Sequence, residues 1–165
     1  KGLGLVLLIY GGLMLIGLAG GNTDPLQPLK GLAASGGSSV QQQHLQFKKI
    51  KTVADLEREI QAASAAGKTV MLDFYADWCV SCKEFDKYVF TDPQVLAALQ
   101  NTVSLQADVT ANDDKDQAML QKFGLIGPPG IIVYNQKGDE VKTHRVVGYM
   151  EAPTFAEHVK KALAQ

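Results

Sequence analysis

The feature that most constrains this chain is an apolar segment that runs directly into a pair of cysteines. Residues 69–76, TVMLDFYA, are almost entirely apolar and are typical of a strand buried in the centre of a sheet. Residues 77–82, DWCVSC, follow at once and contain both cysteines of the chain, Cys79 and Cys82. We expect a helix to begin at these cysteines, so that both sulfurs lie where a central strand ends and a helix starts.

The apolar residues between positions 44 and 165 recur with the strand period and the helix period in alternation. We expect strands at residues 44–50, 69–76, 103–109, 130–135 and 140–148, and helices at residues 53–67, from the cysteines to about 90, 93–100, 113–124 and 152–165. Thr52 and Asp92 are suitable N-caps for two of these helices. The order βαβαβαββα predicts an α/β fold with a central mixed sheet flanked by helices.

The N-terminal residues have a different composition. Residues 2–21 carry no charge and are mostly apolar, and as a helix they would be roughly 30 Å long, which matches the hydrocarbon core of a bilayer. We predict a transmembrane helix at residues 1–21, at the end of a larger membrane domain. A secretory signal peptide, with Lys1 as its basic residue, is the alternative. If Lys1 marks the cytoplasmic side, the rest of the chain lies outside.

The next segment, residues 22–43, is rich in Pro, Gly, Ser and Gln and cannot bury enough apolar surface to fold alone. It predicts a flexible linker, which leaves residues 44–165 as the folded domain. The charges of the chain are balanced, with 16 Lys and Arg against 17 Asp and Glu. There is no basic run, which argues against a nucleic-acid partner.

Three kinds of site could use the cysteine pair: a metal site, a structural disulfide or a redox-active disulfide. A zinc site needs four ligands, and His44, His144 and His158 lie far from the cysteines in sequence. A structural disulfide here would close only a short ring, which restricts the unfolded chain little. In a redox pair, the free N–H groups of the helix start would stabilise a Cys79 thiolate as nucleophile, and Cys82 would resolve the mixed disulfide. We favour the redox pair, without metal or other cofactor.

The sequence around the cysteines resembles a known family. The segment DFYADWCVSCK is similar to the active-site segment of thioredoxin-fold oxidoreductases. More narrowly, YADWCVSCKEF, then TDPQV and ADVTAND, resemble the C-terminal periplasmic domain of the DsbD family of thiol:disulfide interchange proteins. The resemblance covers nearly the whole chain and implies a thioredoxin fold behind a last membrane helix and a linker.

The same resemblance implies a function. It implies a protein-disulfide reductase domain that takes electrons from the transmembrane domain of the same protein. The acceptors would be the N-terminal domain of that protein or other periplasmic thiol proteins, with a link to cytochrome c biogenesis. The location would be the bacterial inner membrane, with residues 22–165 on the periplasmic side. No cofactor is implied beyond the Cys79–Cys82 disulfide.

Two acidic residues flank the cysteines. Asp73 lies six residues before Cys79 within the apolar strand, where thioredoxin-fold proteins carry a buried, proton-accepting Asp. A partly solvated carboxylate at the strand end is the alternative. Asp86 lies four residues after Cys82, on the same helix face, where DsbD proteins usually carry Glu. Two carboxylates near one thiol oppose its ionisation, so we expect Cys79 to be less acidic than the helix terminus alone would make it.

Substrate docking is expected from three further residues. Trp78 directly precedes the reactive cysteine and would shield it and form docking surface, unless it is a core aromatic. The resemblance makes Pro129 the cis-proline that faces the cysteines, with Pro128 contributing only its carbonyl; an ordinary trans turn is the alternative. Gly130 stands where the family often has Thr.

Other residues carry no proposed chemistry. We expect Tyr75, Phe85 and Tyr88 to pack in the core or at its rim, and the acidic cluster Asp113, Asp114 and Asp116 to form a solvated helix start.

Two rival functions stay open at this point. One is a stand-alone, membrane-tethered thioredoxin that serves cytochrome c maturation. The other is a redox-inert domain that uses the fold only for docking.

Overall fold

The computed structural model describes residue 4 and residues 43–164. The described residues from Gln43 onward belong to one compact unit, and this unit contains both cysteines. The transmembrane helix expected at residues 1–21 and the linker expected at residues 22–43 fall outside the described part, apart from Gly4 and Gln43. Among the described residues, no helix has the length and apolar character needed to cross a membrane.

A five-stranded mixed sheet forms the centre of the domain, in the order β1-β3-β2-β4-β5. The strands are β1 (Lys48–Ile50), β2 (Thr69–Tyr75), β3 (Thr102–Asp108), β4 (Gly130–Tyr134) and β5 (Val146–Val147). The first three strands in this order run parallel, whereas β4 pairs antiparallel with both β2 and β5. Strand β2 is therefore central, and all but the last of its residues are buried.

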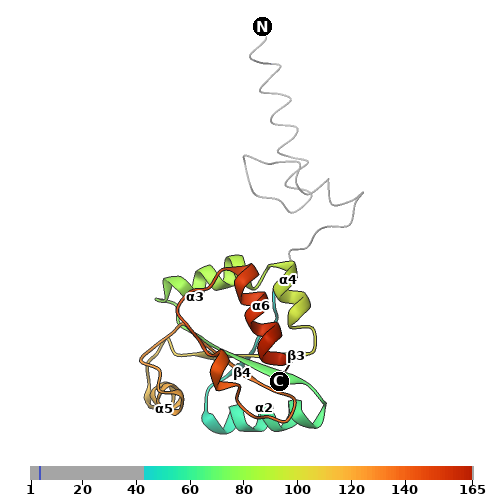
Figure 1. Cartoon of the computed structure of the whole chain (residues 1–165). Helices are drawn as coiled ribbons and strands as arrows, with labels where there is room; N and C mark the ends of the chain where they lie inside the picture. The colour runs from blue at the N-terminus through green and yellow to red at the C-terminus, as the bar shows by residue number, and fades with distance from the viewer. Residues whose placement is uncertain (1–3, 5–42, 165) are drawn as a thin grey trace. The chain divides into compact units, whose positions relative to one another are not determined.

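Helices cover both faces of the sheet, as Figure 1 shows. The helices are α2 (Val53–Ala65), α3 (Val80–Glu84), the π-helix η2 (Phe85–Val89), α4 (Pro93–Ala98), α5 (Asp114–Phe123), the short 3₁₀-helix η3 (Lys142–His144) and α6 (Ala152–Leu163). One apolar core lies between the sheet and the α2 and α5 side, and a second lies under η2, α4 and α6. The predicted α/β fold, a mixed sheet flanked by helices, is confirmed.

Local signals explain where the helices begin. The Thr52 hydroxyl accepts a hydrogen bond from Asp55 N–H, and the Asp55 carboxylate accepts one from Thr52 N–H, which makes a capping box at the start of α2. Asp92 caps α4 with Pro93 in its first turn. Gly124 ends α5 in the left-handed conformation, at φ 65°. The caps expected at Thr52 and Asp92 are confirmed.

Two predicted strands are much shorter in the structure. In the 44–50 segment only Lys48–Ile50 pair with the sheet, while Leu45 and Phe47 pack against the second core. The alternation of this segment therefore reflects packing rather than pairing. In the 140–148 segment, a single bridge at Glu140 and the two residues of β5 are separated by η3.

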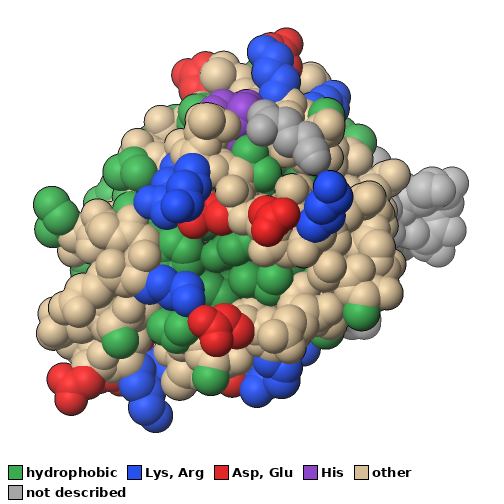
Figure 2. All heavy atoms as spheres, turned by 60° about the horizontal axis from the view of Figure 1, so that its bottom comes forward, with side chains coloured by type: hydrophobic (Ala, Val, Ile, Leu, Met, Phe, Trp, Pro, Cys, Tyr) green, Lys and Arg blue, Asp and Glu red, His purple; other side chains and the backbone are tan. Residues whose placement is uncertain are grey.

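The α2 side of the domain carries a hollow that is unrelated to the cysteines. Figure 2, turned so that this side comes forward, shows hydrophobic side chains gathered in a depression with acidic and basic side chains around it. A shallow pocket between α2 and the turn before Glu140 is lined by Glu57, Ile60, Gln61, Ser64, Ala65, Lys137 and Gly138. None of these residues belongs to the predicted site.

The acidic residues at the start of α5 are not all solvated, contrary to the expectation for Asp116. Asp113 and Asp114 are exposed as predicted, but Asp116 is only 2% exposed. Its carboxylate accepts a hydrogen bond from Asp113 N–H and lies 2.5 Å from Lys51 Nζ. Asp116 is therefore the third residue of a capping box, turned inward to a lysine at the end of β1, and not a solvated charge.

Replacing Asp116 with alanine should lower the free energy of unfolding by about 2 to 3 kcal/mol. The substitution removes the hydrogen bond that Asp116 contributes to the capping box and a charge-assisted hydrogen bond to Lys51. Chemical denaturation measures the loss. Asp114→Ala is the matched control, because Asp114 is an exposed neighbour in the same turn, and it should cost no more than about 0.5 kcal/mol. Equal losses in the two variants would contradict the inward role of Asp116.

Candidate active site

The two cysteines form a disulfide between Cys79 and Cys82. Cys79 is the N-cap residue of α3, directly after the loop that leaves β2, and Cys82 lies one turn into the helix. Both side chains are buried, with exposed fractions of 5% for Cys79 and 3% for Cys82. The expected location, between the end of a central strand and the start of a helix, is confirmed.

The backbone around the pair stabilises negative charge on the first sulfur. Cys82 N–H donates a hydrogen bond to Cys79 Sγ at 3.1 Å, at the end of the helix where N–H groups lack intrahelical partners. Cys82 Sγ lies 3.7 Å from the carbonyl oxygen of Phe74. In the disulfide this sulfur carries no hydrogen, whereas a reduced Cys82 thiol could donate to that oxygen. The arrangement therefore distinguishes Cys79 as the sulfur better able to become a thiolate.

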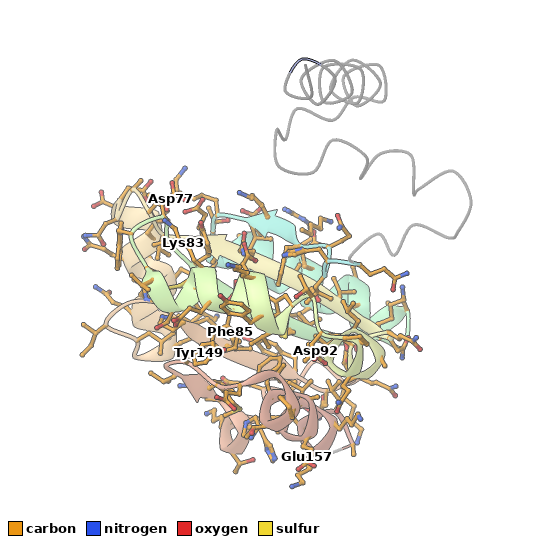
Figure 3. The ribbon with its side chains drawn as sticks, turned by 90° about the horizontal axis from the view of Figure 1, so that it is seen from above. Asp77, Lys83, Phe85, Asp92, Tyr149 and Glu157 are labelled. Atoms are coloured by element: carbon orange, nitrogen blue, oxygen red, sulfur yellow. A yellow bond between two sulfur atoms is a disulfide. The ribbon has the colours of Figure 1, made fainter. Side chains whose placement is uncertain are left out.

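The helix that carries the pair changes geometry after one and a half turns. Helix α3 ends at Glu84, and Phe85–Val89 continue as a π-helix, with Phe90 N–H donating to Phe85 O at 2.8 Å. The expected helix is therefore present but is not α-helical throughout. Phe85 is buried, and the centre of its ring lies 5.3 Å from the centre of the Tyr149 ring. Figure 3 shows the two labelled side chains next to each other. Single turns of π-helix within a longer helix are frequent at functional sites.

Asp73 is buried in β2, with an exposed fraction of 3%. Side chains alternate along a strand, so Asp73 projects to the same face as Met71, which packs with Phe85 of the helix η2. Burial raises the pKa of Asp73 to about 7, Gln106 opposes that rise by a hydrogen bond, and the charge of Asp86 adds to it. The alternative of a solvated strand-end carboxylate is wrong.

Gln106 is the hydrogen-bond partner of this carboxyl group. It lies directly opposite Asp73 in the register of β2 and β3, and its Nε2 donates to Asp73 Oδ2 at 3.0 Å. An amide can donate to an ionised carboxylate and, after a flip, accept from a protonated one. Gln106 can therefore serve Asp73 in both protonation states.

Asp86 lies in the π-helix, and its side chain is 41% exposed. Its carboxylate Oδ1 is 3.4 Å from Nε2 of His44, at the start of the described domain. Its charge acts on Asp73, which places the two predicted acids within electrostatic reach of each other.

Trp78 lies on the surface, with an exposed fraction of 60%. Thr110 holds the loop on which it sits: Trp78 Nε1 donates to Thr110 O at 3.4 Å, and Asp77 N–H donates to Thr110 Oγ1 at 2.9 Å. A Cβ placed on Gly127 would lie 3.9 Å from the edge of the indole. Trp78 is therefore not a core residue and stands beside the loop that leads to Pro128.

The Pro128–Pro129 peptide bond is cis, as expected, and both prolines are half-buried. The next residue, Gly130, begins β4 and is buried. A Cβ at this position would lie 2.7 Å from Leu125 Cδ1. The Leu125 side chain thus occupies the space that a side chain such as Thr would need, and it would have to shift to admit one.

Large apolar side chains are exposed on the segments that carry the cysteines and the cis-proline, and on the strand β5 beside them. Val80 lies between the cysteines, Ile126 precedes the cis-proline loop, and Val147 pairs with Gly130 across β4 and β5. The exposed fractions are 72% for Val80 and 104% for Ile126. Together with Trp78 these residues give the site an apolar rim. Within residues 43–164 no group of three or more His, Cys, Asp or Glu side chains could hold a metal ion.

Three contributors to the site do not follow from the sequence analysis. Gln106 stands out only as a polar residue in the apolar strand segment VSLQADV, which is a usable signal for a buried partner. His44 and Thr110 carry no such signal, because their contacts depend on how distant segments are brought together.

Comparisons with known proteins agree with this geometry. A model of a thioredoxin-like family matches residues 51–135. The thiol:disulfide interchange protein DsbD of Ralstonia nicotianae is 46% identical over 99% of this chain, and that of Cronobacter sakazakii is 52% identical over 74% of it. The chain spans only 27% and 21% of those two relatives.

One solved domain matches this chain over nearly the whole length of the solved domain. The C-terminal domain of DsbD from Neisseria meningitidis, in its oxidised form, is 35% identical, with a TM-score of 0.60, and the match covers 70% of this chain and 99% of that domain. The reduced form of the same domain matches with a TM-score of 0.59. The chain belongs to the thioredoxin-like family and, within it, to the C-terminal domains of the thiol:disulfide interchange protein DsbD.

Proposed function

We propose that this domain is a protein-disulfide reductase that relays electrons by thiol–disulfide exchange, from a transmembrane domain of the same protein to oxidised proteins in the periplasm. The observation that carries the proposal is the Cys79–Cys82 disulfide at the start of α3, where Cys82 N–H donates to Cys79 Sγ, and Asp73 is buried in the strand that leads to it. Similarity to DsbD proteins supports the direction and the compartment.

The reaction starts from the reduced pair. The Cys79 thiolate attacks one sulfur of a partner disulfide, the partner S–S bond breaks, and a partner thiolate leaves and takes up a proton. The Cys82 thiol then loses its proton and attacks Cys79 Sγ, which releases the second partner thiolate and forms the Cys79–Cys82 disulfide. Two electrons pass to the partner, and a thiol pair of the membrane domain restores the reduced state by the same steps in reverse.

Asp73 is the proposed acceptor of the Cys82 proton. A general base works best when its pKa lies near the working pH, and burial brings the pKa of Asp73 to about 7. The same carboxylate, together with Asp86, opposes formation of the Cys79 thiolate because like charges repel. The two acids thus lower the thiolate fraction of Cys79 in the free domain, and a docked partner would hold its disulfide close enough for that small fraction to attack.

The apolar rim is the proposed docking surface. Trp78 and Val80 expose large apolar areas beside sulfurs that are themselves buried, and exposed apolar patches commonly mark interaction sites. Pro128 and Pro129 lie on the neighbouring loop and would meet the partner chain. The N-terminal domain of the same protein is the first expected acceptor, with other periplasmic thiol proteins, including those of cytochrome c biogenesis, as further ones.

Membrane attachment is part of the proposal. The uncharged run at residues 2–21 is long enough to span a bilayer, and the polar residues 22–43 would let the domain reach both donor and acceptor. The domain would then face the periplasm from the inner membrane.

Replacing Cys82 with alanine should trap partners as mixed disulfides. Cys79 can still attack, but no second thiol is present to resolve the product. In cells, the variant should accumulate adducts that dithiothreitol releases and that mass spectrometry identifies. The matched control Cys79→Ala retains one cysteine in the same loop and should trap at most a small fraction of the same adducts.

The identity of the trapped proteins separates the rival functions. Adducts with a DsbD N-terminal domain or with several thiol proteins would support the relay. Adducts with apocytochrome alone would favour the tethered thioredoxin for cytochrome c maturation. A complete absence of adducts would leave only a redox-inert docking domain.

The role of Asp73 as a base near neutral pH requires a pKa that is raised in the folded domain, and a raised pKa predicts a pH-dependent stability. Its folded pKa of about 7 lies above the ordinary value of 3.8, so its contribution to stability is fully present below about pH 4 and is lost as the pH rises through 7. Between pH 5 and 8 the disulfide form should lose about 3 kcal/mol of unfolding free energy that Asp73→Asn does not lose.

Denaturant unfolding at both pH values checks this difference. Asp77→Asn is the matched control, since Asp77 is an exposed carboxyl group near the same loop, and it should keep the wild-type loss. If Asp73→Asn shows the same loss as the wild type, the pKa of Asp73 is not raised in the folded domain, and Asp73 is not a proton acceptor poised near neutral pH.

The restraint on Cys79 predicts a change in thiol reactivity. In the reduced protein, Asp73→Asn combined with Asp86→Asn should shift the midpoint of iodoacetamide alkylation at Cys79 to lower pH by about one unit, because two negative charges near the thiolate are removed. Mass spectrometry of Cys79 follows the alkylation. A midpoint that stays in place or rises would refute the restraint while leaving the trapping result intact.

A further inference from the structure

The first residues of the described domain are fixed against the helix that carries the active site. Leu45 N–H donates to Phe90 O at 2.9 Å, and the ring of Phe47 meets that of Phe90 edge-on at 4.9 Å. These contacts hold His44 beside η2, where its Nε2 lies 3.4 Å from Asp86 Oδ1. The imidazole is 38% exposed and the Asp86 carboxylate 41% exposed, so the pair lies at the surface.

The hydrogen bonds of the ring determine where its proton sits. His44 Nδ1 is 2.8 Å from Leu45 O, and a carbonyl oxygen only accepts, so this bond requires a proton on Nδ1. In the neutral ring, Nε2 then presents a lone pair to the Asp86 carboxylate, which also only accepts. The contact between His44 and Asp86 becomes a hydrogen bond when the pair holds one further proton. With that proton the pair is neutral, and without it the pair carries one negative charge.

His44 is the residue placed to neutralise the negative charge of Asp86. The pocket beside the ring is lined by His44, Lys83, Asp86, Lys87, Tyr88 and Thr91, all of the others from α3, η2 and the residue after Phe90. Lys87 Nζ lies over the ring of Tyr88, 5.0 Å from its centre. Among the described residues, His44 is the one basic side chain within 4 Å of the Asp86 carboxylate, and it carries a charge only when it is protonated.

The charge of this pair reaches the interior of the site. The negative charge of Asp86 is one of the causes that raise the pKa of Asp73, behind burial in importance. An extra proton on the His44–Asp86 pair cancels part of that charge, which favours ionisation of Asp73.

We propose that His44 is a positioning residue of the active site: it shares one exchangeable proton with Asp86, and this proton sets the negative charge that faces Asp73. His44 touches neither sulfur and acts only through Asp86. Its consequence for electron transfer rests on the proposed function, whereas the proton-holding pair itself does not.

The test is an NMR titration of the disulfide form of the 165-residue chain, labelled at aspartate and histidine. Nitrogen shifts of the His44 ring report its tautomer, and the carboxyl shift of Asp73 reports its protonation. The variants are His44→Gln, which can still donate to Asp86 but carries no charge, Asp86→Asn, and the two combined. His158→Gln, the same substitution on α6, is the matched control for the loss of one imidazole.

The proposal predicts the Nδ1–H tautomer in the neutral ring of His44. It also predicts that His44→Gln strengthens proton binding at Asp73 by about twofold, a modest factor because the pair is exposed and screened. Asp86→Asn should weaken proton binding at Asp73, and in that background the effect of His44→Gln should nearly vanish. His158→Gln should leave Asp73 unchanged.

Three results would overturn the proposal: the Nε2–H tautomer, no response of Asp73 to His44→Gln, or an equal response with and without Asp86. None of these measurements needs a redox partner. If Asp73 responds as expected but Cys82→Ala traps no partner, the proton pair stands and the reductase function fails. If partners are trapped and Asp73 ignores His44, the function stands and this inference fails.

Discussion

A carboxyl group buried in the central strand is the constraint on which the rest of the site depends. Asp73 lies in β2 with hydrogen-bonded strands on both sides and helix η2 above. A charge buried without partners would cost far more than the domain could tolerate. Burial raises the pKa of Asp73 and the hydrogen bond from Gln106 lowers it, and the two together hold this pKa at about 7.

Three ionisable groups of the site lie at different depths below the protein surface, and their charges affect one another. Asp73 is fully enclosed, Asp86 is at the surface of η2, and His44 is held outside it by the segment that enters the domain. Exposed pairs contribute little to stability because water and salt screen them. The same pair still changes the potential at a buried neighbour, where screening is weaker. A surface contact can thus matter to chemistry without mattering to the fold.

Much of this domain is predictable from its sequence, for reasons that differ from residue to residue. The central strand and the helix start are encoded locally, by an apolar run and the cysteine spacing, and the burial of Asp73 follows from its apolar neighbours. The short form of β1 does not follow, because Leu45 and Phe47 alternate like a strand while packing on the second core. Periodicity reports which side chains are buried but not whether the backbone pairs. Nor does the burial of Asp116 follow, since its neighbours are acidic and its partner Lys51 lies sixty-five positions earlier in the chain.

The contrast between buried sulfurs and an exposed rim bears on how partners are selected. Cys79 and Cys82 are almost inaccessible, while Trp78 and Val80 project into solvent. Small oxidants meet little sulfur surface, and a protein disulfide can reach Cys79 only when its flanking residues cover the rim. Covering the rim also removes water, which strengthens every charge effect on the pair. Under the proposed function, shape recognition would therefore come before chemistry, and the two acids would keep the Cys79 thiolate scarce in the free domain, where an unselective thiolate would be most harmful.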